Sequence, residues 1–333
     1  ITENESAPTV ALSVSATSIA ENAGTSITVT ATLSGATDEA VTVALSTSGT
    51  ATEGTDYGSL SDITISAGAT TGTTTFTPTD DSMYETSTDE TATVAIDTVS
   101  GGSATENGTQ SVTITINENE SAPTVTLSTS ATSIAENAGS SLTITATLST
   151  ATTADVTVTI GTAGTATEGT DYTDGSGNLD DITISAGSTT GTVSFTPTDD
   201  ASDPVYEENE TAIISIGSVS GGDATENGTQ SVTITINENE SAPTVTLTTS
   251  ATSIDENSGS VLTLTATLSN ATTADVTVSI ATSGTATEGT DYTDGSGNID
   301  DITISAGATT GTVSFTPTDD SIYDATSNET ATV

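Results

Sequence analysis

The chain has 333 residues, of which 46 are Asp or Glu and none is Lys, Arg or His, so its formal net charge is -46. Without cationic side chains it cannot neutralise phosphates, which excludes nucleic acids and anionic lipid surfaces as direct partners. Cys is absent too, so the chain lacks the imidazole, thiolate, amine and guanidinium groups that most catalysis uses. Oxygen is the only strong ligand atom left, and it suits hard cations.

Apolar residues that alternate with Thr predict β-strands along the first 116 residues. Ile27, Val29 and Leu33 show this period of two, which is typical of a half-buried strand. Seven strands in about 115 residues predict an all-β, immunoglobulin-like sandwich. The dipeptide Asn107 and Gly108 predicts a type I′ hairpin before the last strand. In chain order the predicted strands lie near residues 9–14, 27–33, 41–45, 63–66, 73–77, 92–96 and 111–116.

The whole pattern then repeats. ITENESAPTV at residues 1–10 returns as INENESAPTV at residues 116–125 and 236–245, and the blocks GTATEGTDY and FTPTDD recur in step. Repeats of this length predict tandem β-sandwiches. The predicted units are the end of a preceding repeat at residues 1–6, two repeats at 7–120 and 121–240, and a third at 241–333 that stops before its last strand.

A sandwich without its last strand would expose unpaired edges. Two interpretations stay open. The sequence is a window of a longer repetitive protein, or neighbouring molecules associate and supply the missing strand by exchange. No apolar run approaches the roughly 20 residues that cross a bilayer, so we expect no membrane insertion.

The acidic residues gather in the connections between strands, as in the pair Asp80 and Asp81 or in Glu118 with Glu120. Loops of a sandwich collect at its two ends, so these carboxylates are expected to converge at one tip. Converging carboxylates repel each other unless a cation lies between them, and calcium is the natural candidate. For a single carboxylate, a soluble acidic surface is the simpler interpretation. The recurring Asp-Asp pair favours a metal.

The ordered landmarks of each repeat are Glu-Asn-x-Gly, Gly-Thr-Ala-Thr-Glu-Gly-Thr-Asp-Tyr, Ser-Ala-Gly, Asp-Asp followed by Tyr-Glu and Glu-Thr-Ala, and a closing Ile-Asn-Glu-Asn. This order resembles the Calx-beta repeat, a family found in sodium/calcium exchangers, an integrin β chain and bacterial surface proteins. The resemblance covers essentially the whole chain. It implies a seven-stranded immunoglobulin-like sandwich that binds Ca²⁺ at one tip.

The resemblance also implies ligands, although Asn117 and Asn119 stand where the family carries a terminal aspartate run, which lowers the charge of the site. In the first repeat the implied ligands are Glu21, Asp56, Asp80, Asp81, Glu85, Glu90 and Glu118. In the second repeat they are Glu136, Asp171, Asp199, Asp200, Glu207, Glu210 and Glu238. In the third repeat they are Glu256, Asp291, Asp319, Asp320 and Asp324.

Together these features predict a structural, calcium-binding segment of an extracellular or cell-surface stalk, fibre or biofilm matrix protein that provides reach and cohesion. The alternative is an adhesin segment whose calcium-ordered loops bind glycans or host proteins, and the longer loop after Tyr172 is a candidate contact. Paired carboxylates also suggest a glycosidase. We expect no enzyme, because an active site rarely recurs in every repeat and no Trp is present to stack on a sugar.

Overall fold

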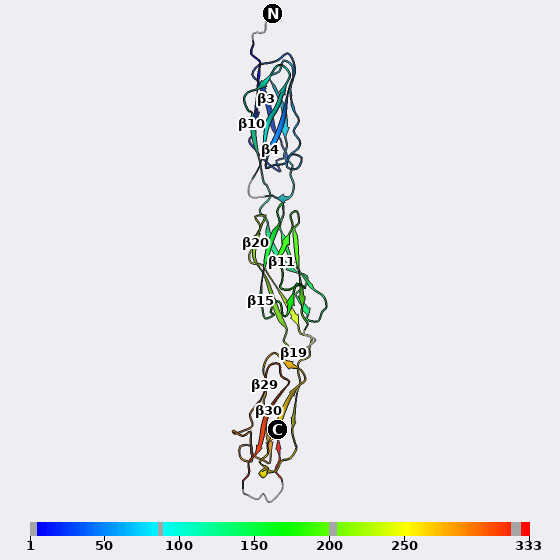
Figure 1. Cartoon of the computed structure of the whole chain (residues 1–333), viewed down its shortest axis with the longest axis vertical. Coiled ribbons are helices and arrows are strands. Elements are labelled where there is room, and N and C mark those ends of the chain that lie inside the picture. Colours follow the sequence, from blue (N-terminus) through cyan, green and yellow to red (C-terminus); the bar gives the residue numbers. More distant parts are fainter. Residues whose placement is uncertain (1–4, 86–88, 200–204, 321–327) are drawn as a thin grey trace.

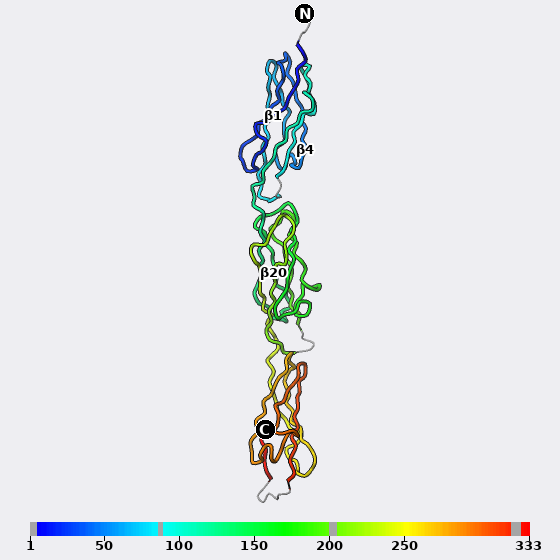
Figure 2. The backbone as a smooth tube through the Cα atoms, turned by 90° about the vertical axis from the view of Figure 1, so that its left-hand side faces the viewer, coloured from blue at the N-terminus to red at the C-terminus, as the bar shows by residue number. Residues whose placement is uncertain are grey.

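The computed structural model describes residues 5–85, 89–199, 205–320 and 328–333, and within these ranges it is all-β apart from the short 3-10 helix η1 (Glu256–Ser258). Three sandwiches lie end to end and form a rod (Figures 1 and 2). We call them units 1, 2 and 3, and each has its own hydrophobic cluster. The predicted division at residues 120/121 and 240/241 stays a prediction.

Unit 1 contains all seven predicted strands in two sheets. The short strands β2 and β9 were not predicted, and they pair in parallel with β10 and β1. One sheet has the order β6 (Thr71–Phe76), β3 (Ile27–Leu33), β1 (Thr9–Val14), β9 (Thr105–Glu106). The other has the order β2 (Ser18–Ala20), β10 (Ser111–Asn117), β8 (Glu90–Ser100), β4 (Val41–Gly49), β5 (Ile63–Ile65).

Unit 2 repeats this arrangement, and unit 3 keeps part of it. The first sheet of unit 2 is β16 (Tyr172–Thr173), β18 (Thr190–Pro197), β13 (Leu142–Leu148), β11 (Thr124–Thr129), β21 (Thr225–Glu226). Its second sheet is β12 (Ser133–Ala135), β22 (Ser231–Asn237), β20 (Glu210–Ser220), β15 (Val156–Gly164), β17 (Ile182–Ile184). Unit 3 has β23 (Val245–Thr249), β24 (Leu262–Leu268), β30 (Thr310–Pro317) and β28 (Tyr292–Thr293) in one sheet, and the pairs β26 (Val276–Val278) with β29 (Ile302–Ile304) and β27 (Ser283–Gly284) with β31 (Ala331–Thr332).

The core follows the alternation in the sequence. Val29 and Ala31 of β3 are fully buried, whereas the Thr residues of the same strand are half-buried or exposed. Each unit adds one stacked aromatic pair, in unit 1 the rings of Tyr57 and Phe76 with centroids 4.6 Å apart. Tyr57 ends the block GTATEGTDY, so this block supplies the largest side chain of a core that has few aromatic residues.

The predicted type I′ hairpin at Asn107 and Gly108 is wrong. Such a turn needs positive φ at both central residues, but Ser103 and Asp223 are the non-glycine residues with positive φ in the described ranges. The flanking strands also do not pair with each other, because β9 pairs with β1 and β10 pairs with β8. The dipeptide lies where the chain passes from one sheet to the other.

Unit 3 is more open along β23. Val245 and Leu247 are 45% and 39% exposed, whereas the corresponding Val125 and Leu127 of unit 2 are 0% and 8% exposed. In the described part of unit 3, β23 pairs with β24 alone, while β11 has partners on both sides. No helix in the described ranges combines the length and the hydrophobicity that spanning a bilayer would require.

A short parallel strand pair joins each unit to the next. At the first junction β7 (Met83–Tyr84) of unit 1 pairs with β14 (Ala151–Thr152) of unit 2. At the second junction β19 (Val205–Tyr206) pairs with β25 (Ala271–Thr272), and Figure 1 labels β19 between the two units.

Candidate metal centre

Two groups of three carboxylates form in each of units 1 and 2. In every group, one oxygen from each residue lies within 4.8 Å of the other two. We call the first type the strand-end group and the second the loop group. The strand-end groups are Glu21, Glu118, Glu120 in unit 1 and Glu136, Glu238, Glu240 in unit 2. The loop groups are Asp56, Glu85, Glu90 in unit 1 and Asp171, Glu207, Glu210 in unit 2.

Parallel strand pairing creates the strand-end group. Strands β2 and β10 run side by side in the same direction, so their ends leave the sheet together. Glu21 follows β2, and its N–H donates to the carbonyl oxygen of Asn117 at 3.1 Å. Glu118 and Glu120 follow β10 and are two residues apart, which places both on one side of an extended chain. The group therefore depends on a contact between residues almost 100 positions apart.

The loop group is formed by one residue from a turn, one that follows β7 and one at the beginning of β8. Asp56 lies in the turn before Tyr57, where one of its carboxylate oxygens accepts the N–H of Thr52 at 2.5 Å. Glu85 follows β7 and Glu90 begins β8. The N–H of Glu85 donates to Glu118 Oε2 at 2.8 Å, so the two groups are joined by a hydrogen bond.

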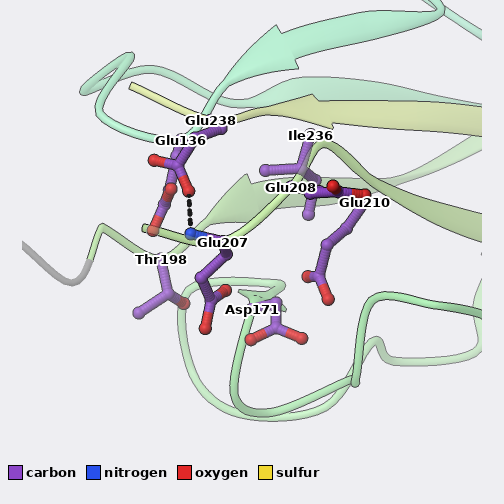
Figure 3. A pocket seen from close by; sticks show the side chains of 8 residues that line it. All are labelled: Glu136, Asp171, Thr198, Glu207, Glu208, Glu210, Ile236 and Glu238. Atoms are coloured by element: carbon purple, nitrogen blue, oxygen red, sulfur yellow. Dashed lines mark hydrogen bonds between the residues drawn. The ribbon is translucent and has the colours of Figure 1, made fainter. Parts of the chain in front are cut away.

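Unit 2 shows the same geometry in close view (Figure 3). The N–H of Glu207 donates to Glu238 Oε2 at 2.5 Å, and the carboxylates of Asp171, Glu207 and Glu210 lie on one side of a small hollow. The residues that line the hollow are Glu136, Asp171, Thr198, Glu207, Glu208, Glu210, Ile236 and Glu238.

Burial makes several glutamates of these groups difficult to ionise. Loss of hydration raises the pKa of Glu21, of Glu85 and of Glu90 to about 7. Negative neighbours add to the effect, for example Asp56 beside Glu90. In unit 2, burial likewise raises the pKa of Glu210 to about 7. A carboxylate surrounded by like charges binds a proton more tightly because ionisation costs both hydration and repulsion.

Each strand-end group also contains two glutamates whose pKa values shift in opposite directions. Burial and the neighbouring carboxylate of Glu118 raise the pKa of Glu120 to about 7. Glu118 is buried too, but the pKa of its carboxyl is lowered because the N–H groups of Glu85 and Glu120 donate to it. In unit 2 the roles are exchanged: burial and the contact with Glu240 raise the pKa of Glu238, and the hydrogen bond from Glu238 lowers that of Glu240.

Several buried oxygens near these groups have no hydrogen-bond partner. In the described ranges four buried side-chain oxygens have no hydrogen-bond partner, namely Glu90 Oε2, Glu120 Oε2, Asn239 Oδ1 and Glu240 Oε2. The chain has no Lys, Arg or His that could approach them. A buried oxygen without a partner costs free energy. An all-oxygen set with unsatisfied, mutually repelling carboxylates fits a hard cation such as Ca²⁺.

Of the residues implied by the resemblance, ten fall in the four groups. Asp80, Asp81 and Asp199 do not. One carboxylate oxygen of Asp81 accepts the N–H of Met83 at 2.7 Å, and the N–H of Asp81 donates to Glu21 Oε1 at 3.2 Å. Asp200 and Asp324 lie outside the described residues. The roles of all these residues as ligands stay predictions.

The described residues of unit 3 form no such group. Glu256 lies in η1 and is exposed, and its Oε1 accepts the N–H of Asp320 at 3.0 Å, as Glu21 does for Asp81 in unit 1. Asp291 accepts the N–H of Thr287 at 2.6 Å, and Asp319 is exposed. The local turns are therefore kept. The described part of unit 3 has no counterpart of Glu118 and Glu120, and Asp324, which matches Glu85 of the loop group, lies outside the described residues.

Two group members, Glu120 and Glu240, were not among the predicted ligands. The signal that could have found them is their spacing. Each is two residues beyond a predicted ligand, Glu118 or Glu238, and extended chains place such residues on the same side.

A model of the Calx-beta domain matches residues 3–120, 118–240 and 238–333. The comparison with curated protein sequences gave no match. Among solved structures, the CBD12 segment of CALX1.2 is 15% identical, with 68% of this chain and 99% of that chain covered and a TM-score of 0.30. The calcium binding domain CBD12 of CALX1.1 is 18% identical, with 61% and 77% covered and a TM-score of 0.28. Invasin, a bacterial integrin-binding protein, is 16% identical, with 92% and 54% covered and a TM-score of 0.36.

Proposed function

Because the chain belongs to the Calx-beta domain family, matched in three tandem copies, we propose that units 1 and 2 bind Ca²⁺ at their strand-end and loop groups. The observation that carries this proposal is the set of buried carboxylate oxygens that have neither a hydrogen-bond donor nor a cationic side chain near them. A bound calcium ion would supply the positive charge that lets these carboxylates ionise together.

The residues that would hold the ion are the members of the four groups. Their backbone contacts give the site its stiffness. Glu118 accepts the N–H of Glu85, and Glu21 accepts that of Asp81, so the connection between β6 and β8 is fastened to the ends of β2 and β10. Ionised carboxylates accept these hydrogen bonds more strongly than protonated ones. Metal binding and ordering of the tip are therefore expected to support each other.

We further propose that the chain is a structural segment of an extracellular stalk, fibre or matrix protein. Three units stacked in a rod support a role in reach (Figure 1). The carboxylate groups recur in units 1 and 2 beside the chain that leads to the next unit, which favours a binding and stiffening role over catalysis.

Thermal unfolding in chelator and in calcium tests the metal proposal. Binding to the folded state alone stabilises it by RT ln(1 + [L]/Kd), which is about 2.7 kcal/mol for one site at 100-fold excess over Kd. We expect the melting temperature to rise with free calcium in the millimolar range, and NaCl of equal ionic strength to produce a smaller rise. Equal melting temperatures in chelator and in calcium would overturn the proposal.

The open edge of unit 3 supports association with a further strand. Val245 and Leu247 are exposed there, although their counterparts in unit 2 are buried. We propose that a neighbouring repeat supplies the missing strands, one with the pattern of β21 beside β23 and one with the pattern of β22 over its exposed face. Sedimentation at increasing protein concentration tests whether a second molecule supplies them: Leu247→Asp should abolish association, and a wild-type chain that stays monomeric at all concentrations would exclude exchange between molecules.

The adhesin alternative rests on the longer loop of unit 2. Asp174 Oδ1 accepts the N–H groups of Ser176 and Gly177 at 2.7 and 3.0 Å, so this exposed loop has a defined shape. Replacing residues 173–181 by the shorter connection of unit 1 should remove binding to a glycan array if the loop is a contact. Unchanged binding would exclude this loop from the adhesive surface.

A further inference from the structure

The first junction contains a specific contact between side chains of two units. The hydroxyl of Tyr84 in unit 1 donates to Asp223 Oδ2 in unit 2 at 3.1 Å. Tyr84 is 4% exposed although it belongs to a short strand at the end of its unit. Burial, followed by the hydrogen bond to Asp223, raises the pKa of Tyr84, so its hydroxyl keeps the proton that it donates.

The backbone of the same segment is held as well. The N–H of Thr153 donates to the carbonyl oxygen of Tyr84 at 3.2 Å, and the hydroxyl of Thr153 donates to the carbonyl oxygen of Glu85 at 3.1 Å. We call residues 83–85 the strap, and residues 151–153 together with 221–223 the socket. The strap thus meets donors from one socket segment and an acceptor from the other.

Glycine makes the socket possible. Gly222 has φ +55, and a Cβ at this position would lie 2.9 Å from the hydroxyl oxygen of Thr152. The next residue, Asp223, also has positive φ, at 49°. The two socket segments therefore approach each other closely at Gly222, and the side chain of Asp223 projects from a backbone with positive φ.

Unit 1 carries the same backbone at the corresponding place, with different side chains. Gly102 packs against Thr37 as Gly222 packs against Thr152, and Ser103 has φ 53. In the sequence, however, Asp38 stands where unit 2 has Thr153, and Ser103 stands where it has Asp223. Asp38 has no hydroxyl to donate to a strap carbonyl, and its carboxylate would repel the acidic residue of the strap. Unit 3 has Thr273 at this position and receives the strap of unit 2, in which Tyr206 is again followed by Glu207.

We propose that Thr153 and Asp223 are specificity-determining residues of this joint: they recognise a strap that carries Tyr at the position of Tyr84, and they fix unit 2 on unit 1 without a metal ion. The hydroxyl of Thr153 recognises the strap backbone beside the glutamate, and Asp223 recognises the tyrosine hydroxyl. The unit 1 combination of Asp38 and Ser103 discriminates against the same strap. Discrimination of this kind uses both favourable contacts and a repulsive one. This inference does not rest on the calcium function proposed above, although Glu85 belongs both to the strap and to the loop group of unit 1.

Amide hydrogen exchange of Thr153 in the full chain reports the joint directly, because this N–H donates across it. In the presence of chelator we expect the wild-type amide to be protected. Thr153→Asp and Asp223→Ser, which install the unit 1 residues, should each reduce its protection roughly tenfold, the scale of losing a hydrogen bond that involves a charged group. Tyr84→Phe should have an effect similar to that of Asp223→Ser, and Asp223→Asn, which keeps an acceptor, should retain part of the protection.

The matched control is the reverse exchange in unit 1, Asp38→Thr with Ser103→Asp, which should leave the Thr153 amide unchanged. Protection of the Gly187 amide, which donates to the carbonyl oxygen of Thr152 within unit 2, confirms that the socket itself is folded in each variant. Wild-type protection in both Thr153→Asp and Asp223→Ser would overturn the proposal. So would loss of wild-type protection in chelator, since the metal would then hold the joint. Failure of calcium to change the melting temperature would overturn the metal function and leave this inference standing.

Discussion

Single carboxylates in this chain owe their properties to where the fold places them. Glu21 is 8% exposed and has a pKa raised by burial, whereas Asp97 is an exposed residue of β8. Both are ordinary acidic residues in the sequence. They differ because Glu21 loses its hydration on folding and no cationic side chain compensates for that loss.

The raised pKa values predict an unusual pH dependence of stability in chelator. A carboxyl whose pKa rises from 4.5 to about 7 on folding binds more protons in the folded than in the unfolded state. The free energy of unfolding should therefore fall as the pH rises from about 4.5 to about 7, by on the order of 1 kcal/mol per group. Urea unfolding at several pH values measures this. Constant or increasing stability across that range would contradict the prediction.

In saturating calcium, the fall in stability should be reduced or reversed. A cation favours the ionised carboxylates, so binding releases their protons and calcium affinity increases through pH 7. Calcium titrations at pH 6 and pH 8, followed by calorimetry, check this expectation. Equal affinities at the two pH values would show that the groups with raised pKa do not contact the ion.

Substitution of Glu120 should separate the effect of its charge on stability from its effect on metal binding. At pH 8, above the raised pKa of Glu120, Glu120→Gln removes a negative charge from the strand-end group of unit 1 while keeping its size. In chelator we expect unit 1 to be as stable as the wild type or more stable by about 1 kcal/mol, because repulsion is relieved. In calcium, its stabilisation should decrease.

The matched control for Glu120→Gln is Asp97→Asn, which removes an exposed charge outside the groups. It should alter neither the stability in chelator nor the response to calcium. An equal loss of the calcium response in both variants would indicate a general charge effect in place of a site.

At the scale of elements, the ends of paired strands determine where the acidic side chains meet. Parallel pairing of β2 with β10 brings Glu21 next to Glu118, and the corresponding pairing of β12 with β22 does the same in unit 2. Unit 3 has no described counterpart of β10, and its described residues form no carboxylate group. In units 1 and 2 the closing strand therefore leads directly into two members of the strand-end group.

Strand β15 ends on a glycine that packs directly against its neighbour. Gly164 has φ +121, and an added Cβ would lie 2.0 Å from the carbonyl oxygen of Thr211. We expect Gly164→Ala to destabilise unit 2 by roughly 2–4 kcal/mol, because both the conformation and the contact are unfavourable for alanine. Gly177→Ala, in the exposed loop where nothing lies within 4 Å, should change stability by less than about 0.5 kcal/mol. Urea unfolding followed by NMR signals of unit 2 measures both, and equal effects would refute the explanation.

At the scale of the whole molecule, the rod carries an uncompensated charge of -46. Like charges along the whole surface repel each other, and this self-repulsion destabilises a compact state. Salt screens it, with a Debye length of about 10 Å at 0.1 M. The charge therefore affects all three units, in contrast to the local carboxylate groups.

Monovalent salt is accordingly expected to stabilise the chelated protein. The melting temperature should rise steadily as NaCl increases from about 0.02 M to about 0.5 M, since the sequence has no Lys, Arg or His whose attraction to a carboxylate salt could weaken. Differential scanning calorimetry at several salt concentrations tests this. A melting temperature that falls with salt would show that attractive charge interactions outweigh the repulsion.

Local patterns were sufficient to predict much of this protein. The alternation of Thr with Val, Ile and Leu predicted the seven strands of unit 1, because strand faces have a period of two whatever their partners. The recurring blocks predicted tandem units, and the resemblance that they carry is now supported by the family match. The family resemblance also implied ten residues that lie in the carboxylate groups, and their role as ligands stays a prediction.

Other features depended on contacts that no local pattern encodes. Asn107 and Gly108 have the composition of a hairpin turn, but the sheet partners of β9 and β10 place them in a crossing between sheets. Which carboxylates lose their water, and which oxygens remain unpaired, follows from strands that pair across about 100 residues. The joint between Tyr84 and Asp223 spans 139 positions and two units. Sequence alone determined the strands and the repeat, since these depend on neighbouring residues, whereas tertiary structure decided the grouping of charges and the joints, since these depend on burial and on distant partners.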